Sequence, residues 1–404
     1  MMPQVGWVLL SRDALSRAEM QLREDVMSVR DEIGFLLIHS GYANRFFPGT
    51  SVRHTRLRYL LFIPWMYQDI LRHGERKDLG QKVLNAETKL AGRLRNLDGA
   101  IGGRSYPEPT DQPPTSVYWT ALGTWGILKR RPDGTCLAKA QLHSAMARRY
   151  AIVNLFDDDG SPLEDLPDFF IRVPKAPNEW SNPNDVISFL MPPEERMFMR
   201  NQLLGVMKHS DANEPSLLSL LAEHVNELGT EKSQYPWNKA VTQYADPADR
   251  AALQRARMAA ALSDVGRAVY AALVETLREV EDGIPTEDIH RSYLAEVLVR
   301  SRDEAQALNL AELNLDLPDL PPYLNDVLNQ TLSWLANPRD LMVLWDVYAK
   351  AEEKRKGRRA RLSRRLSGKE RRTEWRPNDQ SYASAIHYRW PKVLRLLRDL
   401  KGET

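Results

Sequence analysis

The sequence has a single cysteine, Cys136, among its 404 residues. One cysteine cannot form an intramolecular disulfide, and cysteine-rich zinc modules need several thiolates. The chain also lacks the run of about 20 apolar residues with which a helix spans a bilayer, and it does not open with a basic and then apolar leader. These absences predict a cytoplasmic protein without a membrane partner. The content of 43% hydrophobic and 27% charged residues is typical of globular proteins.

The usual signatures of nucleotide and metal chemistry are also missing. The chain contains neither Gly-x-x-x-x-Gly-Lys-Ser/Thr nor Gly-x-Gly-x-x-Gly, and its eight histidines form no His-x-x-x-His or His-x-Lys pattern. Asp168 and Lys175 could serve as the acid and lysine of a nuclease core, but the prolines between them argue against a paired central strand. We therefore predict no cofactor, no metal and no catalytic residue. Catalytic carboxylates dispersed in the sequence remain an alternative.

The formal net charge of +2 hides a strong segregation of charge along the chain. Residues 1–150 carry a net charge of +8, residues 151–349 carry −17 and residues 350–404 carry +11. Such asymmetry is typical of chains that bind nucleic acid or dock onto an oppositely charged partner. A solvated acidic face with a disordered basic tail would give the same distribution, so both interpretations stay open.

Apolar periodicity predicts a mainly α, multi-helical fold. The clearest case is residues 246–280, where apolar residues recur every three to five positions behind the N-cap pair Asp246-Pro247. We expect further helices at residues 12–32, 59–72 (interrupted or kinked at Pro64), 79–97, 286–308 and 338–356. A few short strands are expected around residues 165–190, at 169–173 and 186–190.

Composition predicts four parts. These are an N-terminal helical domain (1–150), a proline-rich irregular connector (151–200), an acidic helical domain (201–350) and a basic C-terminal segment with a terminal helix (351–404).

The stretch from Thr115 to Cys136 predicts a helix, a glycine, an extended segment and a tight turn, in that order. Asp133-Gly134 between two extended runs is a strong hairpin signal. This order resembles the back half of a winged helix, near residues 115–137, whose helix enters the major groove while Lys129, Arg130 and Arg131 contact phosphates. Two alternatives remain: an ordinary helix and hairpin with solvated charges, and a winged helix that docks protein only.

A second group of cations directly precedes the most apolar helix of the chain. Arg53, Arg56 and Arg58 run into residues 59–67, which are apolar almost throughout. Cations at a helix N-terminus are disfavoured by the helix dipole unless an anion lies nearby. We therefore include these three arginines among the predicted nucleic-acid contacts.

This same region carries a resemblance to a known family. The motifs that carry it are Val5-Gly6-Trp7-Val8, Arg30-Asp31-Glu32-Ile33-Gly34, Phe46-Phe47-Pro48-Gly49-Thr50-Ser51, residues 55–67 and residues 116–128. They resemble an uncharacterised bacterial family catalogued as a domain of unknown function, over residues 5–130 and more loosely to about residue 200. The segment 9–13 is less acidic than is usual in that family. The resemblance implies genes beside helicase and phospholipase-D-like nuclease genes in anti-phage defence islands, and it implies no catalytic motif.

The densest cluster of cations lies near the C-terminus and is called the basic segment here (residues 354–376). Its predicted contacts with nucleic acid are Lys354, Arg355, Lys356, Arg358, Arg359, Arg361, Arg364, Arg365, Arg371, Arg372 and Trp375. Basic density with an interleaved aromatic suits phosphate neutralisation together with base stacking. A disordered, solubilising linker is the alternative. The helix expected at residues 388–398 is basic and amphipathic, and it could dock on an acidic face, including that of residues 151–349.

Together these patterns predict a non-enzymatic, DNA-associated subunit of a bacterial anti-phage defence system. It would bind duplex or single-stranded DNA while partner helicase or nuclease subunits supply the chemistry. The alternatives are a nuclease or other effector with an unrecognised active site, and an adaptor that only docks protein.

Overall fold

The computed structural model describes residues 31–72, 78–152, 169–182, 185–209, 211–229, 233–375 and 386–403. Most of the helix expected at residues 12–32 lies outside this part of the chain, as does Asp168. The chain divides into two compact units, each assembled from separate stretches of sequence. Unit 1 comprises residues 1–38 and 257–386, and unit 2 comprises residues 39–256 and 387–404. These boundaries differ from the four predicted parts, because contacts in space join both ends of the chain to its middle.

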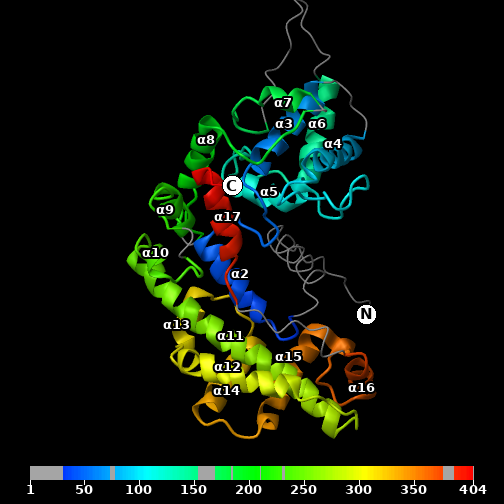
Figure 1. Ribbon diagram of the computed structural model, residues 1–404, viewed down its shortest axis with the longest axis vertical. Coiled ribbons are helices and arrows are strands. Elements are labelled where there is room, and N and C mark those ends of the chain that lie inside the picture. Colours follow the sequence, from blue (N-terminus) through cyan, green and yellow to red (C-terminus); the bar gives the residue numbers. More distant parts are fainter. Residues whose placement is uncertain are drawn as a thin grey trace, which may run out of the picture. The chain divides into compact units, whose positions relative to one another are not determined.

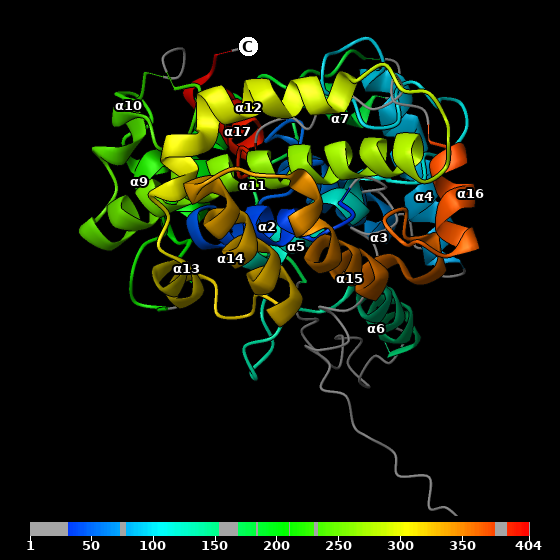
Figure 2. The same ribbon diagram turned by 90° about the horizontal axis from the view of Figure 1, so that it is seen from below.

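Unit 1 is built on an antiparallel pair of long helices, α11 (Pro247–Val280), which begins in unit 2, and α12 (Ile289–Gln306). Figures 1 and 2 both show the two helices running side by side. Polar bridges join them, because the Arg300 guanidinium lies 2.7 Å from the Asp264 carboxylate. Nearer the other end, the Glu275 carboxylate accepts hydrogen bonds from the backbone N–H groups of His290 and Arg291, and so caps α12.

The remaining elements of unit 1 pack around this pair. In chain order they are α13 (Leu310–Asp316), α14 (Pro322–Ala336), the 3₁₀ turn η2 (Leu341–Leu344), α15 (Trp345–Lys356), the 3₁₀ turn η3 (Gly357–Arg359) and α16 (Leu366–Thr373). Helix α14 packs against both α12 and α15. The Phe35 ring lies on α11 at Gly266, where a Cβ atom would come within 2.2 Å of the ring. A larger residue than glycine would therefore force this ring out of place.

Unit 2 is centred on α3 (Tyr59–Arg72), whose residues from Tyr59 to Tyr67 are almost all buried. It also contains α2 (Phe35–Phe46, from His39 on), α4 (Leu79–Leu94), α5 (Pro114–Thr124), α6 (Lys139–Ile152), α7 (Asn178–Ser181), α8 (Pro193–Leu204), α9 (Leu217–Glu223), α10 (Lys239–Thr242) and α17 (Trp390–Lys401). Helix α3 packs against α4 and α5, and α17 packs against α8 and α9. A helix apolar on all sides must be covered on all sides, and these neighbours provide that cover.

The prediction of a mainly α fold is confirmed. Helix α11 begins and ends within a residue of its predicted limits, and α3 continues through Pro64 as one helix. Strand content was overpredicted, since in the described residues pairing is limited to isolated bridges, among them Leu128 with Phe170 and Arg130 with Cys136. Residues 186–190 form no strand. No described helix is long and apolar enough to cross a membrane.

The winged-helix element is not confirmed. Its proposed groove-reading helix is α5, which is buried over Val117, Tyr118, Ala121 and Leu122 and packs against α3. A helix in this position cannot lie in a DNA groove without leaving the core. The predicted turn at Asp133-Gly134 is nevertheless present, because the Gly134 N–H donates to the Arg131 carbonyl at 2.9 Å and Gly134 has a φ of +79°.

Candidate nucleic-acid interface

Arg56 and Arg58 face the interior of unit 2. The Arg56 guanidinium lies 2.7 Å from the Asp399 carboxylate of α17, and the Arg58 guanidinium lies 2.6 Å from the Glu195 carboxylate of α8. Burial raises the pKa of both carboxyl groups, although hydrogen bonds from the arginines oppose the shift. These two arginines therefore tie the start of α3 to α8 and α17, and their charges are already neutralised inside the protein.

The neighbouring residues His54 and Arg53 also make contacts within the protein. The His54 ring stacks on Tyr118 with ring centres 4.3 Å apart, and its Nε2 lies 3.3 Å from the Val117 carbonyl oxygen. Burial lowers the pKa of His54 to about 3, so the ring is neutral. Arg53, half-buried, donates to the side-chain oxygen of Gln112. The anions expected beside the N-terminus of α3 are thus the carboxylates of Asp399 and Glu195 in the same chain.

The turn at residues 129–134, called the basic turn here, lies at the surface of unit 2. Lys129 and Arg130 are exposed, whereas Arg131 is half-buried beside Gln141. The turn is held in place by the backbone, because the Arg131 N–H donates to the Thr135 carbonyl and the Lys129 N–H to the Phe169 carbonyl. Its two exposed cations are available to a ligand without any change in the fold.

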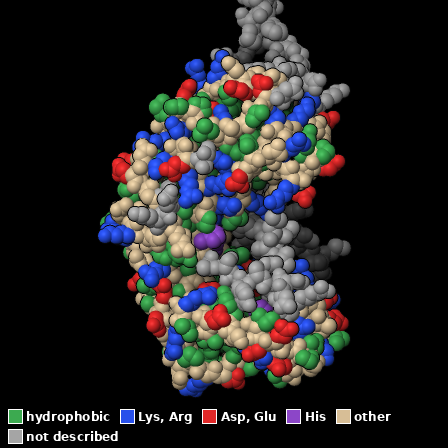
Figure 3. Space-filling model, viewed as in Figure 1, with side chains coloured by type: hydrophobic (Ala, Val, Ile, Leu, Met, Phe, Trp, Pro, Cys, Tyr) green, Lys and Arg blue, Asp and Glu red, His purple; other side chains and the backbone are tan. Residues whose placement is uncertain are grey.

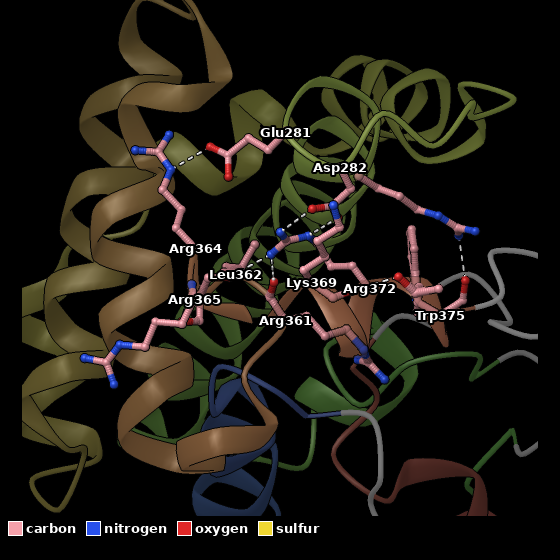
Figure 4. Close-up of polar contacts among 12 residues, drawn as sticks. Glu281, Asp282, Arg361, Leu362, Arg364, Arg365, Lys369, Arg372 and Trp375 are labelled. Carbon is pink, nitrogen blue, oxygen red and sulfur yellow. Dashed lines mark hydrogen bonds and ion pairs between the residues drawn. The ribbon is translucent and has the colours of Figure 1, made fainter. Parts of the chain in front are cut away.

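The basic segment is folded rather than extended as far as Trp375, and its side chains divide into two groups. One group is committed to internal contacts. Arg355 lies 3.4 Å from the Asp31 carboxylate, and Arg361 lies 3.0 Å from that of Glu32. Arg372 is 1% exposed and holds both oxygens of Asp282 at 2.7 and 2.8 Å, while it also donates to the Arg361 and Ser363 carbonyls (Figure 4).

Trp375 also belongs to the committed group. Its ring is 4% exposed and packs against His290 with ring centres 4.9 Å apart, while its carbonyl accepts a hydrogen bond from Arg278 at 2.6 Å. A buried indole offers no face to a nucleic-acid base. The interpretation of Trp375 as a stacking platform is therefore replaced by a role in packing the end of the basic segment onto α11 and α12.

The other group is exposed to solvent. Its exposed members are Lys354, Arg358, Arg359, Arg364, Arg365, Lys369 and Arg371, with Lys356 half-buried. Arg364 pairs with Glu281 and Arg371 with Glu374, and the Lys354 ammonium lies 5.6 Å from the centre of the Tyr323 ring. Four of the exposed cations, called the unpaired cations here, have no ion pair or side-chain hydrogen bond to any described residue: Arg358, Arg359, Arg365 and Lys369. Figure 4 shows the Arg365 side chain pointing away from Arg372 and Asp282.

Two contributors to the positive surface were not among the predicted nucleic-acid contacts. Lys369 was seen as part of the basic run but was not singled out as a contact. On the face of unit 2 seen in Figure 3, Lys and Arg side chains gather over α17, which carries Lys392, Arg395 and Arg398 on its more exposed positions. The amphipathic pattern of this helix was visible in the sequence, and its apolar residues pack on α8 and α9 as part of residues 151–349.

The described residues offer little that resembles a catalytic centre. No group of three or more His, Cys, Asp or Glu side chains among them could hold a metal ion. A shallow groove of about 390 Å³ lies at the end of α14 and is lined by Gln330, Ser333, Trp334, Asn337, Arg339, Val343 and Leu344. Its lining contains no carboxylate, histidine or thiol, so it lacks the groups used for general acid–base or nucleophilic chemistry.

Comparison with known proteins identifies one relationship. A model described as a family of unknown function (DUF6361) matches residues 2–352. The chain belongs to this family. No curated protein and no solved structure matches it.

The DUF6361 match reaches much further along the chain than the resemblance, which was clear only to residue 130. It includes the basic turn and ends within α15. All four unpaired cations lie beyond the matched residues, so they are features of this chain outside the part that the family model describes.

Proposed function

We propose that this DUF6361 protein is a non-enzymatic subunit that binds the phosphate backbone of DNA through the exposed side chains of the basic segment. The observation that carries the proposal is the set of unpaired cations: Arg358, Arg359, Arg365 and Lys369 lie within twelve residues of one another, are exposed and have no anionic partner among the described residues. Most of the other described arginines of unit 1 bind a carboxylate or a carbonyl.

The physical argument concerns the cost of gathering like charges. Exposed cations close in sequence repel one another, and none of these four side chains forms an ion pair with a described residue that would offset this repulsion. A polyanion would offset it and would release its condensed counterions on binding, which supplies most of the affinity in backbone recognition. Arginine suits this role because its planar guanidinium can hold two phosphate oxygens at once.

The basic turn of unit 2 supplies a second set of contacts in this proposal. Lys129 and Arg130 are exposed on a turn whose backbone is fixed by hydrogen bonds. Because the backbone of the turn is already fixed, the entropy lost on binding is confined to the side chains. Since neither set reads base edges, we expect weak sequence preference.

The biological setting of the proposal rests on the resemblance alone. It implies a bacterial anti-phage defence system in which partner helicase or nuclease subunits act on the DNA that this protein holds.

The test is the salt dependence of DNA binding. We expect labelled 20-base-pair duplex to bind the full chain, with log Kd changing linearly with log salt concentration. The double variant Arg358→Gln/Arg359→Gln should bind more weakly, and its slope should be smaller by about 1.8, on the order of 0.9 for each lost phosphate contact. Fluorescence anisotropy between about 50 and 200 mM salt covers the range in which such slopes are measured.

The matched control is Lys350→Gln/Arg339→Gln, which removes the same charge from exposed positions of unit 1. It should leave the slope close to that of the unsubstituted chain. If both double variants weakened DNA binding equally, the affinity would depend on the net charge of the protein and not on these positions. Absence of DNA binding by the unsubstituted chain would overturn the proposal and favour a protein-docking adaptor.

A further inference from the structure

Arg364 and Arg371 are the paired arginines of the basic segment whose ion pairs lie at the surface, and Arg364 also lies over an aromatic ring. Its Nε donates to Glu281 Oε1 at 2.6 Å, and its side chain remains 51% exposed. The guanidinium carbon lies 3.9 Å from the centre of the Trp345 ring, and the Trp345 indole is itself fixed by a 2.9 Å hydrogen bond to the Leu362 carbonyl. The guanidinium thus lies over an aromatic face, which attracts a cation.

The neighbouring Asp282 forms a buried ion pair with which the exposed Glu281–Arg364 pair can be compared. Glu281 and Asp282 follow the last residue of α11, and each binds one arginine of the basic segment (Figure 4). The Asp282–Arg372 pair is 2% exposed on both sides and includes both oxygens of the carboxylate. Breaking such a pair leaves a buried charge without a partner, whereas an exposed single contact exchanges readily with solvent or another anion.

Glu281 contributes little to the helix that it follows. Negative charge near a helix C-terminus is unfavourable because the last carbonyl groups carry the negative end of the dipole. The ion pair with Arg364 offsets part of this cost. Only the Nε edge of Arg364 donates to it, and no described residue accepts a hydrogen bond from the two Nη groups.

We infer that the Arg364 guanidinium, stacked on Trp345, is a phosphate subsite for the nucleic-acid backbone, and that the Glu281 carboxylate occupies it in the free protein. The inference rests on the proposed function and adds to it a named contact and an internal competitor. The carboxylate marks where an anion sits beside this guanidinium. A phosphodiester that approaches the open Nη edge must displace the carboxylate or share the arginine with it.

Substitution of the competitor gives the test. In Glu281→Gln the amide keeps the size of the side chain and removes its charge, so Arg364 becomes fully available. We expect the affinity for the labelled 20-base-pair duplex to rise about two- to fivefold, the range of one exposed ion pair. The slope of log Kd against log salt should steepen by up to about 0.9, the value of one further phosphate contact.

Two controls separate this effect from general electrostatics. Asp303→Asn removes one exposed negative charge from α12 of the same unit and should change affinity less than Glu281→Gln. In the background Arg364→Gln, the substitution Glu281→Gln should give no gain at all. Thermal unfolding of each variant verifies that the fold is retained, which we expect because neither Glu281 nor Arg364 is buried.

The possible results distinguish the two proposals. If the duplex binds, Arg358→Gln/Arg359→Gln weakens it and Glu281→Gln changes nothing, the inference is overturned while the proposed function stands. A gain of equal size in the Arg364→Gln background also overturns the inference. Poly-glutamate serves as a polyanion without phosphate. If Glu281→Gln strengthens its binding but not that of DNA, the subsite takes an acidic peptide instead.

Discussion

Trp375 is held in place by a ring contact and by a hydrogen bond to its backbone carbonyl. The ring lies against His290, and the carbonyl accepts the Arg278 hydrogen bond, so the residue fixes the end of the basic segment to unit 1. Among the described residues, no hydrogen-bond acceptor lies opposite the buried Nε1–H group. The ring contacts named here are thus apolar and aromatic.

We expect Trp375→Ala to lower the free energy of unfolding by about 3–5 kcal/mol, as is typical when a buried aromatic ring is removed. Leu366→Ala is the control in the same segment, because Leu366 is 73% exposed, and it should stay within about 0.5 kcal/mol. Urea unfolding followed by tryptophan fluorescence measures both. Selective loss of single-strand binding with unchanged stability would restore the stacking interpretation.

His54 makes a second residue-scale prediction, which concerns pH. In the unfolded chain a histidine has a pKa of about 6.5, whereas burial lowers the pKa of His54 to about 3. The unfolded state therefore binds the proton more tightly. The stability from neutral His54 is complete above about pH 6.5 and is lost as the pH falls towards 3.

The corresponding variant is His54→Phe, which keeps a ring on Tyr118 but cannot titrate. Between pH 7 and pH 5 its free energy of unfolding should fall by about 2 kcal/mol less than that of the unsubstituted chain. His209→Gln removes an exposed histidine as the control and should follow the unsubstituted chain. Equal pH dependence of all three proteins would contradict the assignment of a neutral, buried His54.

At the scale of elements, the sequence predicted helices well and their partners poorly. The apolar stripe of α11 gave its limits within a residue, because one face of a long helix must repeat every 3.6 residues. The cations before α3 indicated a nearby anion. However, no periodicity could identify Asp399, which is 343 residues from Arg56 in sequence. Likewise, counting charges could not show that Arg372 is buried and Arg365 exposed, although both lie in one basic run.

The basic segment also shows why a truncation is a poor test of binding. Residues up to Trp375 comprise the end of α15, the 3₁₀ turn η3 and α16, and they contact Arg278 and Asp282 at the end of α11. We therefore expect their deletion to destabilise unit 1. The loss of DNA binding would then report on folding. Single substitutions at exposed and buried positions of the segment separate these two contributions.

We expect Asp282→Asn to destabilise unit 1 by about 3–5 kcal/mol, because the buried Arg372 guanidinium loses its bidentate carboxylate. Its neighbour provides the control, since Glu281→Gln breaks an exposed pair and should cost no more than about 1 kcal/mol. Chemical denaturation at pH 7 compares the two directly. If both substitutions lowered the free energy of unfolding by similar amounts, the buried Asp282–Arg372 pair would contribute no more to stability than the exposed pair.

For the whole molecule, the structure shows which of the charges counted in the sequence are exposed to solvent. The basic N-terminal part and the basic C-terminal part are each divided between interior ion pairs and exposed cations, so the net charges of +8 and +11 overstate what a ligand encounters. The exposed remainder is found in both units, on the basic turn and on the basic segment. Each unit therefore presents its own set of exposed cations.

The last prediction concerns chemistry on the bound DNA. The full chain, purified alone, should leave labelled single- and double-stranded DNA intact in the presence of Mg²⁺ or Mn²⁺, because the described residues contain no cluster of metal ligands and the proposed phosphate contacts come only from Arg and Lys side chains. EDTA at constant ionic strength should leave the affinity unchanged, since phosphate neutralisation by side chains needs no bridging ion. Gel assays and anisotropy on one preparation measure both properties. Metal-dependent cleavage that co-purifies with the protein and disappears in Asp168→Asn would instead establish a nuclease, with Asp168 in its active site.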